Sequence, residues 1–177
     1  MPPSPSDPHD LTTARLYLRQ PSVADIDAIV ENCGQWDVAR RLAVVPHPYK
    51  RQDAQYFLEQ IVPKDWCWGI TLKGSPELIG MVGLTPRRDQ HAALGYWLSP
   101  LQWGKGIMTE TAQMVVGFGF TRLGLTSIGA DYHADNPASG QVLQKLGFVE
   151  VGRGLRPCLA QGGDVASIKM HLTQPTN

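Results

Sequence analysis

The spacing of hydrophobic and polar residues changes twice along the chain. Leu16 and Leu18 alternate with polar neighbours, as in a half-buried strand. Ser22, followed three residues later by Asp25, is typical of a helix start, and apolar residues then recur three and four positions apart. This spacing predicts helices over three segments: residues 22–33, 36–42 and 51–61. The first third of the chain is therefore expected to be one strand followed by helices.

The middle third has the composition of consecutive strands. Three runs rich in β-branched, aromatic and other apolar residues are separated by short segments that contain Gly, Pro or charged residues. The runs are residues 66–72, 78–84 and 91–98. Because their links are short, we expect the three strands to pair as an antiparallel meander.

The last third returns to helical spacing and ends in strands. A helix is predicted from Lys105 to Phe118, and a strand over residues 127–133. Asn136 is a candidate N-cap of a further helix, which Gly147 ends. Two strands are expected to follow, over residues 148–152 and 165–172.

This order of elements predicts one α/β domain built on a mixed sheet. The 177 residues suit a single domain, and neither an internal repeat nor a change in composition marks a second one. The domain is expected over residues 12–173. Four prolines among the first eight residues predict a flexible tail over residues 1–11, and residues 174–177 are expected to form a short C-terminal tail.

Charge and cysteine content exclude several classes of protein. Sixteen Lys and Arg balance 16 Asp and Glu, so the chain lacks the basic excess of a nucleic-acid binder. No apolar run approaches the roughly 18 residues of a membrane span, and the N-terminal segment does not resemble a signal peptide. We therefore expect a cytoplasmic protein without a nucleic-acid or membrane partner. The cysteines are far apart and form no CxxC pair, which predicts neither a metal site nor a disulfide framework: Cys33, Cys67 and Cys158.

A loop between a predicted strand and a predicted helix carries the first candidate chemistry. Gly104, Lys105 and Gly106 precede the helix, where unpaired backbone N–H groups can bind a phosphate and glycine allows close approach. A Walker loop is excluded because Ser or Thr does not follow Gly-Lys. A dinucleotide fingerprint is excluded because Thr109 replaces its third glycine. The loop is either an anion site or a plain turn.

A second cluster lies about 30 residues further along the chain. Together the two clusters contain four matching segments: GYWLSP (95–100), WGKGIMTE (103–110), DNPAS (135–139) and LQKLGF (143–148). In order and spacing they resemble the acetyl-CoA-dependent N-acetyltransferases of the GNAT superfamily, in particular the branch typified by the RimJ/RimL ribosomal-protein N-terminal acetyltransferases. The resemblance covers roughly residues 12–173. It implies a mixed, mostly antiparallel sheet, flanked by helices, that splays between the strands ending at Leu98 and near His133.

The resemblance also implies how acetyl-CoA binds. Its pantetheine arm would lie between the two diverging strands, and the loop would hold its pyrophosphate through backbone N–H groups, with Lys105 adding charge nearby. The backbone N–H near Leu98 would polarise the thioester carbonyl. The residues implied in cofactor binding are Trp97, Leu98, Trp103, Gly104, Lys105, Gly106, Ile107, Met108, Asn136 and Ser139.

The implied reaction is direct attack of a neutral primary amine on the thioester, in a ternary complex and without a covalent enzyme intermediate. The acceptor is a protein N-terminal α-amine or a small-molecule amine. Trp36, Tyr49, Trp66 and Trp68 either line the acceptor site or belong to the core. The chain is expected to be a monomer or a homodimer.

The sequence departs from the family where proton transfer is concerned. Leu143 stands where many members carry a tyrosine as general acid, while Ser139 offers a hydroxyl in the Asn-x-x-Ser form of the RimJ/RimL branch. Ala93 stands where related sequences often carry an acidic residue. His133, or alternatively His91, could take the proton of the amine near neutral pH. The candidate catalytic residues are Ser139, Asn136 and His133, each with a plainer interpretation: a hydroxyl bonded to its own helix, a helix cap and a loop histidine.

Two alternative functions follow from the same departures. Trp103 and Met108 replace the first and last residues of the family's R/Q-x-x-G-x-G/A pattern, and Trp103 brings no cation. Because Leu143 and Ala93 replace the tyrosine and the acidic residue of the family, the chain could be a non-catalytic acyl-CoA-binding domain. It could also use another acyl donor such as succinyl-CoA, which would need a cationic group in the cleft that the sequence does not locate.

Overall fold

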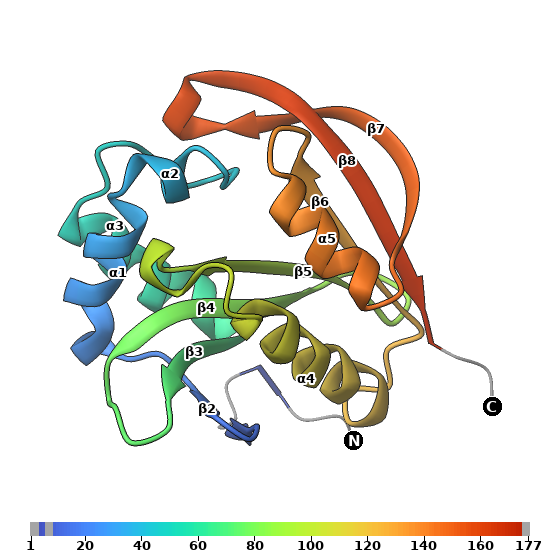
Figure 1. Cartoon of the computed structure of the whole chain (residues 1–177), viewed down its shortest axis with the longest axis horizontal. Coiled ribbons are helices and arrows are strands. Elements are labelled where there is room, and N and C mark those ends of the chain that lie inside the picture. Colours follow the sequence, from blue (N-terminus) through green and yellow to red (C-terminus); the bar gives the residue numbers. More distant parts are fainter. Residues whose placement is uncertain (1–3, 6–8, 175–177) are drawn as a thin grey trace.

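Within residues 4–5 and 9–174, which the computed structural model describes, eight strands form one sheet (Figure 1). Their order in the sheet is β1-β2-β3-β4-β5-β6-β8-β7, and every neighbouring pair is antiparallel except β5 and β6. The strands are β1 (Leu11–Thr12), β2 (Leu16–Arg19), β3 (Trp66–Leu72), β4 (Leu78–Pro86), β5 (His91–Leu98), β6 (Ser127–His133), β7 (Val149–Cys158) and β8 (Gly163–Thr173). The predicted α/β class and the antiparallel meander β3-β4-β5 are confirmed.

The predicted helices are also present. They are α1 (Ile26–Cys33), α2 (Trp36–Ala39), α3 (Arg51–Tyr56), α4 (Ile107–Thr121) and α5 (Pro137–Lys145). The Ser22–Asp25 pair forms a reciprocal capping box at a 3-10 turn that leads into α1. The helix predicted over 51–61 is instead α3 followed by a π-helical turn, Phe57–Ile61.

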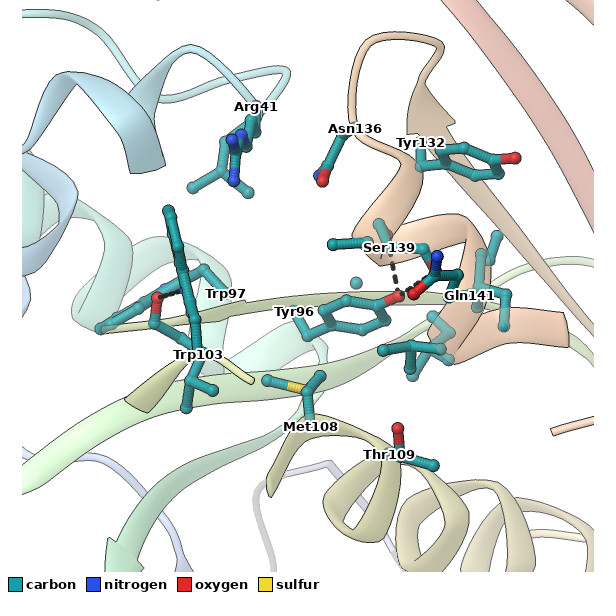
Figure 2. Close-up of a pocket in the computed structure, with 18 of the residues that line it drawn as sticks. Arg41, Tyr96, Trp97, Trp103, Met108, Thr109, Tyr132, Asn136, Ser139 and Gln141 are labelled. Carbon is teal, nitrogen blue, oxygen red and sulfur yellow. Dashed lines mark hydrogen bonds between the residues drawn. The ribbon is translucent and has the colours of Figure 1, made fainter. Parts of the chain in front are cut away.

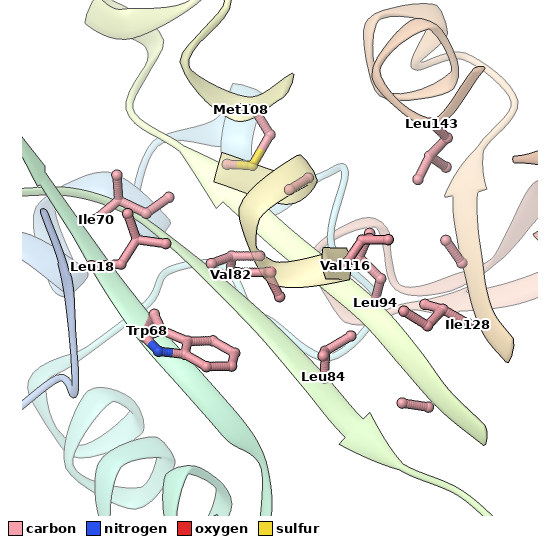
Figure 3. Packing of buried hydrophobic residues seen from close by; sticks show 14 of the residues in the cluster. Leu18, Trp68, Ile70, Val82, Leu84, Leu94, Met108, Val116, Ile128 and Leu143 are labelled. Carbon is pink, nitrogen blue, oxygen red and sulfur yellow. The ribbon is translucent and has the colours of Figure 1, made fainter. Parts of the chain in front are cut away.

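Helices cover both faces of the sheet and bury a separate apolar cluster on each. On one face α4 packs over the central strands, where Trp68, Val82 and Leu84 lie with Val116 (Figure 3). On the other face α1 and α3 pack against Met81. Because successive side chains of a strand point to opposite faces, Met81 and Val82 belong to different clusters. None of the helices within the described residues is long and apolar enough to cross a membrane.

The last two strands are longer than predicted. Strands were expected over 148–152 and 165–172, but β7 and β8 form one long hairpin that extends past α5 (Figure 1). Val151, Leu155 and Leu159 are exposed here, and glycine, arginine and proline lie between them. Most of this stretch is exposed and shows no alternating apolar pattern, so the predicted bounds of the two strands were too short.

The expected tails fall partly outside the described residues. Residues 1–3, 6–8 and 175–177 are not described, so the predicted tails stay predictions there. Leu11 pairs with Leu18 in the sheet, one residue inside the expected N-terminal tail. The backbone carbonyl of His9 accepts a hydrogen bond from the Trp68 indole N–H at 2.6 Å.

The two central strands separate after a short paired stretch. In the described structure β5 and β6 pair in parallel only at His91–Ser127, Ala92–Ile128 and Ala93–Gly129. Beyond this point β5 continues beside β4 to Leu98, and β6 continues beside β8 to His133. The predicted splay is confirmed.

A glycine in β4 fixes where β5 ends. Gly80 lies opposite Leu98, and a Cβ atom on Gly80 would be 2.6 Å from the Trp97 carbonyl oxygen and 3.2 Å from the Leu98 Cα. Both are backbone atoms, so they cannot move aside without shifting β5. A Cβ on Gly129 in β6 would meet only one atom, at 3.9 Å.

We therefore expect Gly80→Ala to lower the free energy of unfolding by about 1–3 kcal/mol, the usual cost of overpacking. Gly129→Ala is the matched control and should change it by less than about 0.5 kcal/mol. Urea denaturation of both variants measures the difference. Equal stability of the two variants would show that β5 moves freely at this point.

Candidate active site

A cavity of about 440 Å³ occupies the opening between β5 and β6 (Figure 2). Its walls come from the end of β5, the first turn of α4, strand β6 and the first turns of α5, and its far end is lined by residues that follow α2. Most of the predicted cofactor-binding residues line it: Trp97, Leu98, Trp103, Gly104, Gly106, Ile107, Met108, Asn136 and Ser139. Segments predicted from distant parts of the sequence therefore meet at one site.

The β5 wall presents backbone polar groups to the cavity. The N–H and C=O groups of one residue in a strand point to the same side, and those of the next residue point to the opposite side. The Ser99 N–H donates to Ile79 in β4 at 2.8 Å, whereas the Leu98 carbonyl, on the opposite side, accepts from the Trp103 indole N–H at 2.8 Å. The Leu98 N–H therefore faces the opening, where β6 is no longer paired with β5.

The glycine loop is shaped for an anion. Gly104 and Gly106 have φ values of +74° and +72°, in the left-handed region that favours glycine. Gly106 is the N-cap of α4, whose first N–H groups have no partner within the helix. The loop is fastened from outside, because Arg15 donates to the Lys105 carbonyl at 2.8 Å and to Glu110 at 2.7 Å. These features fit the pyrophosphate of a coenzyme.

The Lys105 side chain turns away from the cavity. Its ammonium group donates to the Leu101 carbonyl at 2.8 Å and to the Gln102 side chain at 3.1 Å. Lys105 is also not among the residues that line the cavity. Its predicted contribution of charge to the cofactor is therefore not supported by this geometry.

A tyrosine that the sequence analysis did not single out reaches the predicted general acid. The Tyr96 hydroxyl lies 2.8 Å from the Ser139 hydroxyl oxygen and 3.2 Å from the Ser139 carbonyl (Figure 2). Burial raises the pKa of Tyr96 to about 12, although the bond to Ser139 opposes this shift. The phenol is therefore protonated at neutral pH. Leu143, where the family often has a tyrosine, is fully buried in the core.

Asn136 stands at the N-cap position of α5 but does not cap it through its side chain. No hydrogen bond joins its amide to the backbone of the first turn, and the helix begins with Pro137. The amide instead points into the cavity (Figure 2). The prediction of a side-chain cap was wrong, because the Asn136 backbone, with a ψ of 68°, is not in the extended conformation that lets an N-cap side chain reach the N–H groups of the first turn.

Neither histidine proposed as a base reaches the cavity. His133 is buried, and its Nδ1 lies 3.1 Å from the Arg40 carbonyl oxygen. The same carbonyl accepts from the Cys158 thiol at 3.4 Å and from the Gln161 amide at 2.9 Å. His133 therefore joins β6 to the segment after α2. His91 lies at the opposite end of β5 and contacts the Ser127 hydroxyl.

The four aromatic residues considered for the acceptor site also lie elsewhere. Trp68 is fully buried in the apolar cluster under α4, and Trp66 packs against that cluster. Tyr49 packs against the cluster on the other face of the sheet, and Trp36 is exposed. None of the four lines the cavity; residues after α2 line it instead, among them Arg41, for which the sequence carried no signal.

Comparison with known proteins assigns the family. Residues 15–149 match the family described as the acetyltransferase (GNAT) domain. The chain belongs to the GNAT family. It is thus an N-acetyltransferase that uses acetyl-CoA, as the sequence predicted, rather than a sensor without activity.

Relatives and solved structures agree with this family. The chain is 33% identical to the N-acetyltransferase YoaA of Bacillus subtilis strain 168 over 160 residues, which is 86% of this chain and 89% of YoaA. The fold is similar to that of a ribosomal-protein-S5-alanine acetyltransferase from Vibrio fischeri, with a TM-score of 0.80 and 21% identity over 94% of this chain and all of the other. It is also similar to RimL, a ribosomal L7/L12 α-N-protein acetyltransferase solved with coenzyme A, with a TM-score of 0.81 and 16% identity over 93% and 98% of the two chains.

The glycine loop gives a prediction for cofactor affinity. A valine at Gly106 would strain the left-handed backbone at the N-cap of α4, and its Cβ would lie 3.6 Å from the Arg15 guanidinium that fastens the loop. Gly106→Val should therefore distort the loop that is expected to hold the pyrophosphate and raise the Kd of acetyl-CoA at least about tenfold, or 1.4 kcal/mol. Gly74→Val is the matched control, because Gly74 has a φ of +84° and lies in the turn before β4, away from the cavity. Both variants suffer the same backbone strain, and only the first should bind weakly in a calorimetric titration. Equal affinities would contradict the assignment.

The environment of His133 gives a prediction for pH dependence. Burial lowers the pKa of His133, and the nearby Arg156 charge lowers it further. Its Nε2 is buried without a partner, so a proton added there would be left without an acceptor. Below pH 6.5, the ordinary histidine pKa, the unfolded chain takes up a proton that the folded chain refuses, so stability falls as pH decreases.

We expect the free energy of unfolding to decrease between pH 7.5 and 5.5, and to decrease less in His133→Gln. His171→Gln, on the neighbouring strand β8, is the control and should keep the dependence of the native chain. Urea denaturation at several pH values measures both. Identical pH profiles for the native chain and His133→Gln would show that His133 does not titrate in this way.

Proposed function

We propose that this enzyme transfers an acetyl group to a primary amine by direct attack within a ternary complex, in the cavity between β5 and β6. The observation that supports this most is the early separation of the two strands, which turns the Leu98 N–H toward the cavity. A hydrogen-bond donor fixed at this point can stabilise negative charge on a carbonyl oxygen. Acetyl-CoA supplies the activated acetyl group when bound.

The site residues divide the remaining work. The first turn of α4 and the loop of Gly104 and Gly106 hold the pyrophosphate through backbone N–H groups. The Leu98 N–H polarises the thioester carbonyl. Trp103, bonded to the Leu98 carbonyl, keeps that peptide group in place. These contacts position the thioester at the end of β5.

Ser139 and Tyr96 form the proton-donating side of the site. When the amine attacks and the carbon–sulfur bond breaks, the departing thiolate takes a proton from the Ser139 hydroxyl. Tyr96, which is 2.8 Å from that hydroxyl and remains protonated, replaces the proton. Tyr96 thus brings from β5 the phenol that many family members carry at the position of Leu143.

Proton removal from the amine is assigned to solvent. Neither His133 nor His91 lines the cavity, and its two carboxylates, Asp37 and Asp131, are exposed. The small neutral fraction of the amine is the species that attacks. The acceptor is a protein N-terminal α-amine, as for the ribosomal-protein acetyltransferases of similar fold, or a small-molecule amine.

The experiment is a measurement of coenzyme A release and of acetylated products by mass spectrometry. Purified enzyme, acetyl-CoA and two panels of amines are used, one of peptides with free N-termini and one of small molecules. The proposed function predicts stoichiometric CoA release and N-acetylated product. Release of CoA without an acetylated amine would overturn it.

Ser139→Ala tests the proton donor. We expect kcat to fall by about tenfold or more, the lower end of general acid effects because a thiolate is a good leaving group. Tyr96→Phe should lower kcat in the same direction, while the Kd of acetyl-CoA and the melting temperature of Ser139→Ala stay unchanged. A weaker Kd with native kcat would make Ser139 a cofactor-binding residue. Full activity of both variants would show that the departing thiolate takes its proton from solvent.

A further inference from the structure

The Arg41 side chain reaches the cavity without a hydrogen-bond or ion-pair partner among the described residues. Its neighbour Arg40 binds Asp37 at 3.2 Å and Asp135 at 2.9 Å, as surface arginines commonly do. The Arg41 side chain makes no hydrogen bond or ion pair with any described residue, and its Nε is buried and unpaired. A buried donor left without an acceptor is costly. The guanidinium therefore needs an acceptor that the chain itself does not supply.

Arg41 is held at the reacting end of the cavity. Its guanidinium carbon lies 4.8 Å from the centre of the Trp103 ring, a cation–π contact that keeps the group over the ring. The Trp103 ring is fixed in turn by its bond to the Leu98 carbonyl. An anion bound by Arg41 would thus lie about one indole ring away from the peptide group that faces the thioester in the proposed function.

Asn136 faces Arg41 from the other wall. Its amide points into the cavity toward the Arg41 guanidinium and has no role as a helix cap (Figure 2). A guanidinium fork and an amide N–H group together match the two oxygens of a carboxylate. The other arginine of the cavity, Arg156, is already bonded to the Asp131 carbonyl at 2.7 Å.

The charge of the site also restricts the acceptor. A primary amine arrives mainly as an ammonium ion, which Arg41 repels. The one carboxylate close to α2 that lines the cavity, Asp37, is exposed and paired with Arg40. An acceptor that carries its own carboxylate next to the amine would cancel this repulsion and occupy the unpaired guanidinium.

We propose that Arg41 and Asn136 form a subsite for a substrate carboxylate beside the reacting centre. The inference rests on the proposed function and deepens it by naming the substrate class. With acetyl-CoA as the donor, the carboxylate is on the acceptor amine, as in a free amino acid. The same group could instead end the acyl chain of a dicarboxylic acyl-CoA, and two arms of one experiment separate these sources.

The first arm measures kcat/KM with acetyl-CoA for free amino acids and for their C-terminal amides, expressed per neutral amine because the amine of the amide is less basic. The native enzyme should prefer the acid at least about tenfold. Arg41→Gln should remove this preference by lowering kcat/KM for the acids more than for the amides, and Asn136→Asp should reduce it by placing a carboxylate opposite Arg41. Arg88→Gln, an exposed arginine in the turn before β5, is the control and should keep the native preference.

The second arm measures the binding of acyl-CoA by calorimetry and needs no turnover. Succinyl-CoA and butyryl-CoA have acyl chains of equal length and differ in the terminal carboxylate. If the acyl chain carries the carboxylate, the native enzyme binds succinyl-CoA at least about tenfold tighter, and Arg41→Gln binds the two equally. An Arg41-dependent preference in either arm supports the subsite and identifies the source.

Two results overturn the subsite. One is the absence of any Arg41-dependent preference in both arms while amides are still acetylated, which leaves the proposed function intact. The other is an equal loss of affinity for acetyl-, succinyl- and butyryl-CoA in Arg41→Gln, which places Arg41 on the shared part of the coenzyme. Failure of every amine, acid or amide, to be acetylated contradicts the proposed function instead, and the binding arm still tests the subsite.

Discussion

Backbone N–H and C=O groups inside a protein need partners, and a strand that leaves its neighbour loses them. β5 and β6 part after three residue pairs, so the peptide groups at the end of β5 face a cavity in place of a strand. The Trp103 indole N–H donates a hydrogen bond to one of these groups, the Leu98 carbonyl, and the Leu98 N–H stays available. In the proposed function, the thioester carbonyl of acetyl-CoA accepts a hydrogen bond from this N–H. The location of the chemistry follows from this one interruption.

The walls of the opening are held rigidly on both sides. Gly80 lets β4 lie against the backbone of Trp97 and Leu98 with no room for a methyl group. On the other wall Gly140 brings α5 so close to Tyr132 in β6 that a Cβ atom would lie 2.6 Å from the phenol oxygen. Two close contacts through glycine thus set the positions of Leu98 and of the first turn of α5, which carry the groups that must meet across the cavity.

The sequence predicts local structure correctly where the signal is confined to neighbouring residues. The pairing of Ser22 with Asp25 is contained in four residues, and the glycine loop with the helix after it is a continuous segment. β7 and β8 were predicted but with bounds that were too short, because the outer part of their hairpin is largely exposed and has no alternating apolar face. The environment of His133 was also not predicted. Its contact with the Arg40 carbonyl, 93 residues earlier in the chain, cannot be inferred from the sequence of β6.

Within the site, the contacts of Tyr96 and Arg41 could not be predicted from the sequence. Tyr96 lies inside a matched motif, and strand alternation puts it on the face opposite Trp97, but its bond to Ser139 depends on how α5 packs. Arg41 follows a short helix and has no motif. Its importance comes from contrast with Arg40, which lies beside it and has two acidic partners. Only the three-dimensional arrangement distinguishes these adjacent arginines.

The Arg40 carbonyl has a consequence for the order in which the molecule is assembled. Its three donors, His133, Cys158 and Gln161, lie 93, 118 and 121 residues further along the chain. Contacts of such separation form late, because a long loop must be closed before they can contribute. During synthesis the meander and α4 can associate while the segment after α2 still lacks every group that fastens it. A translation product that stops before β7 therefore keeps only one of the three donors, His133, even when the glycine loop has folded.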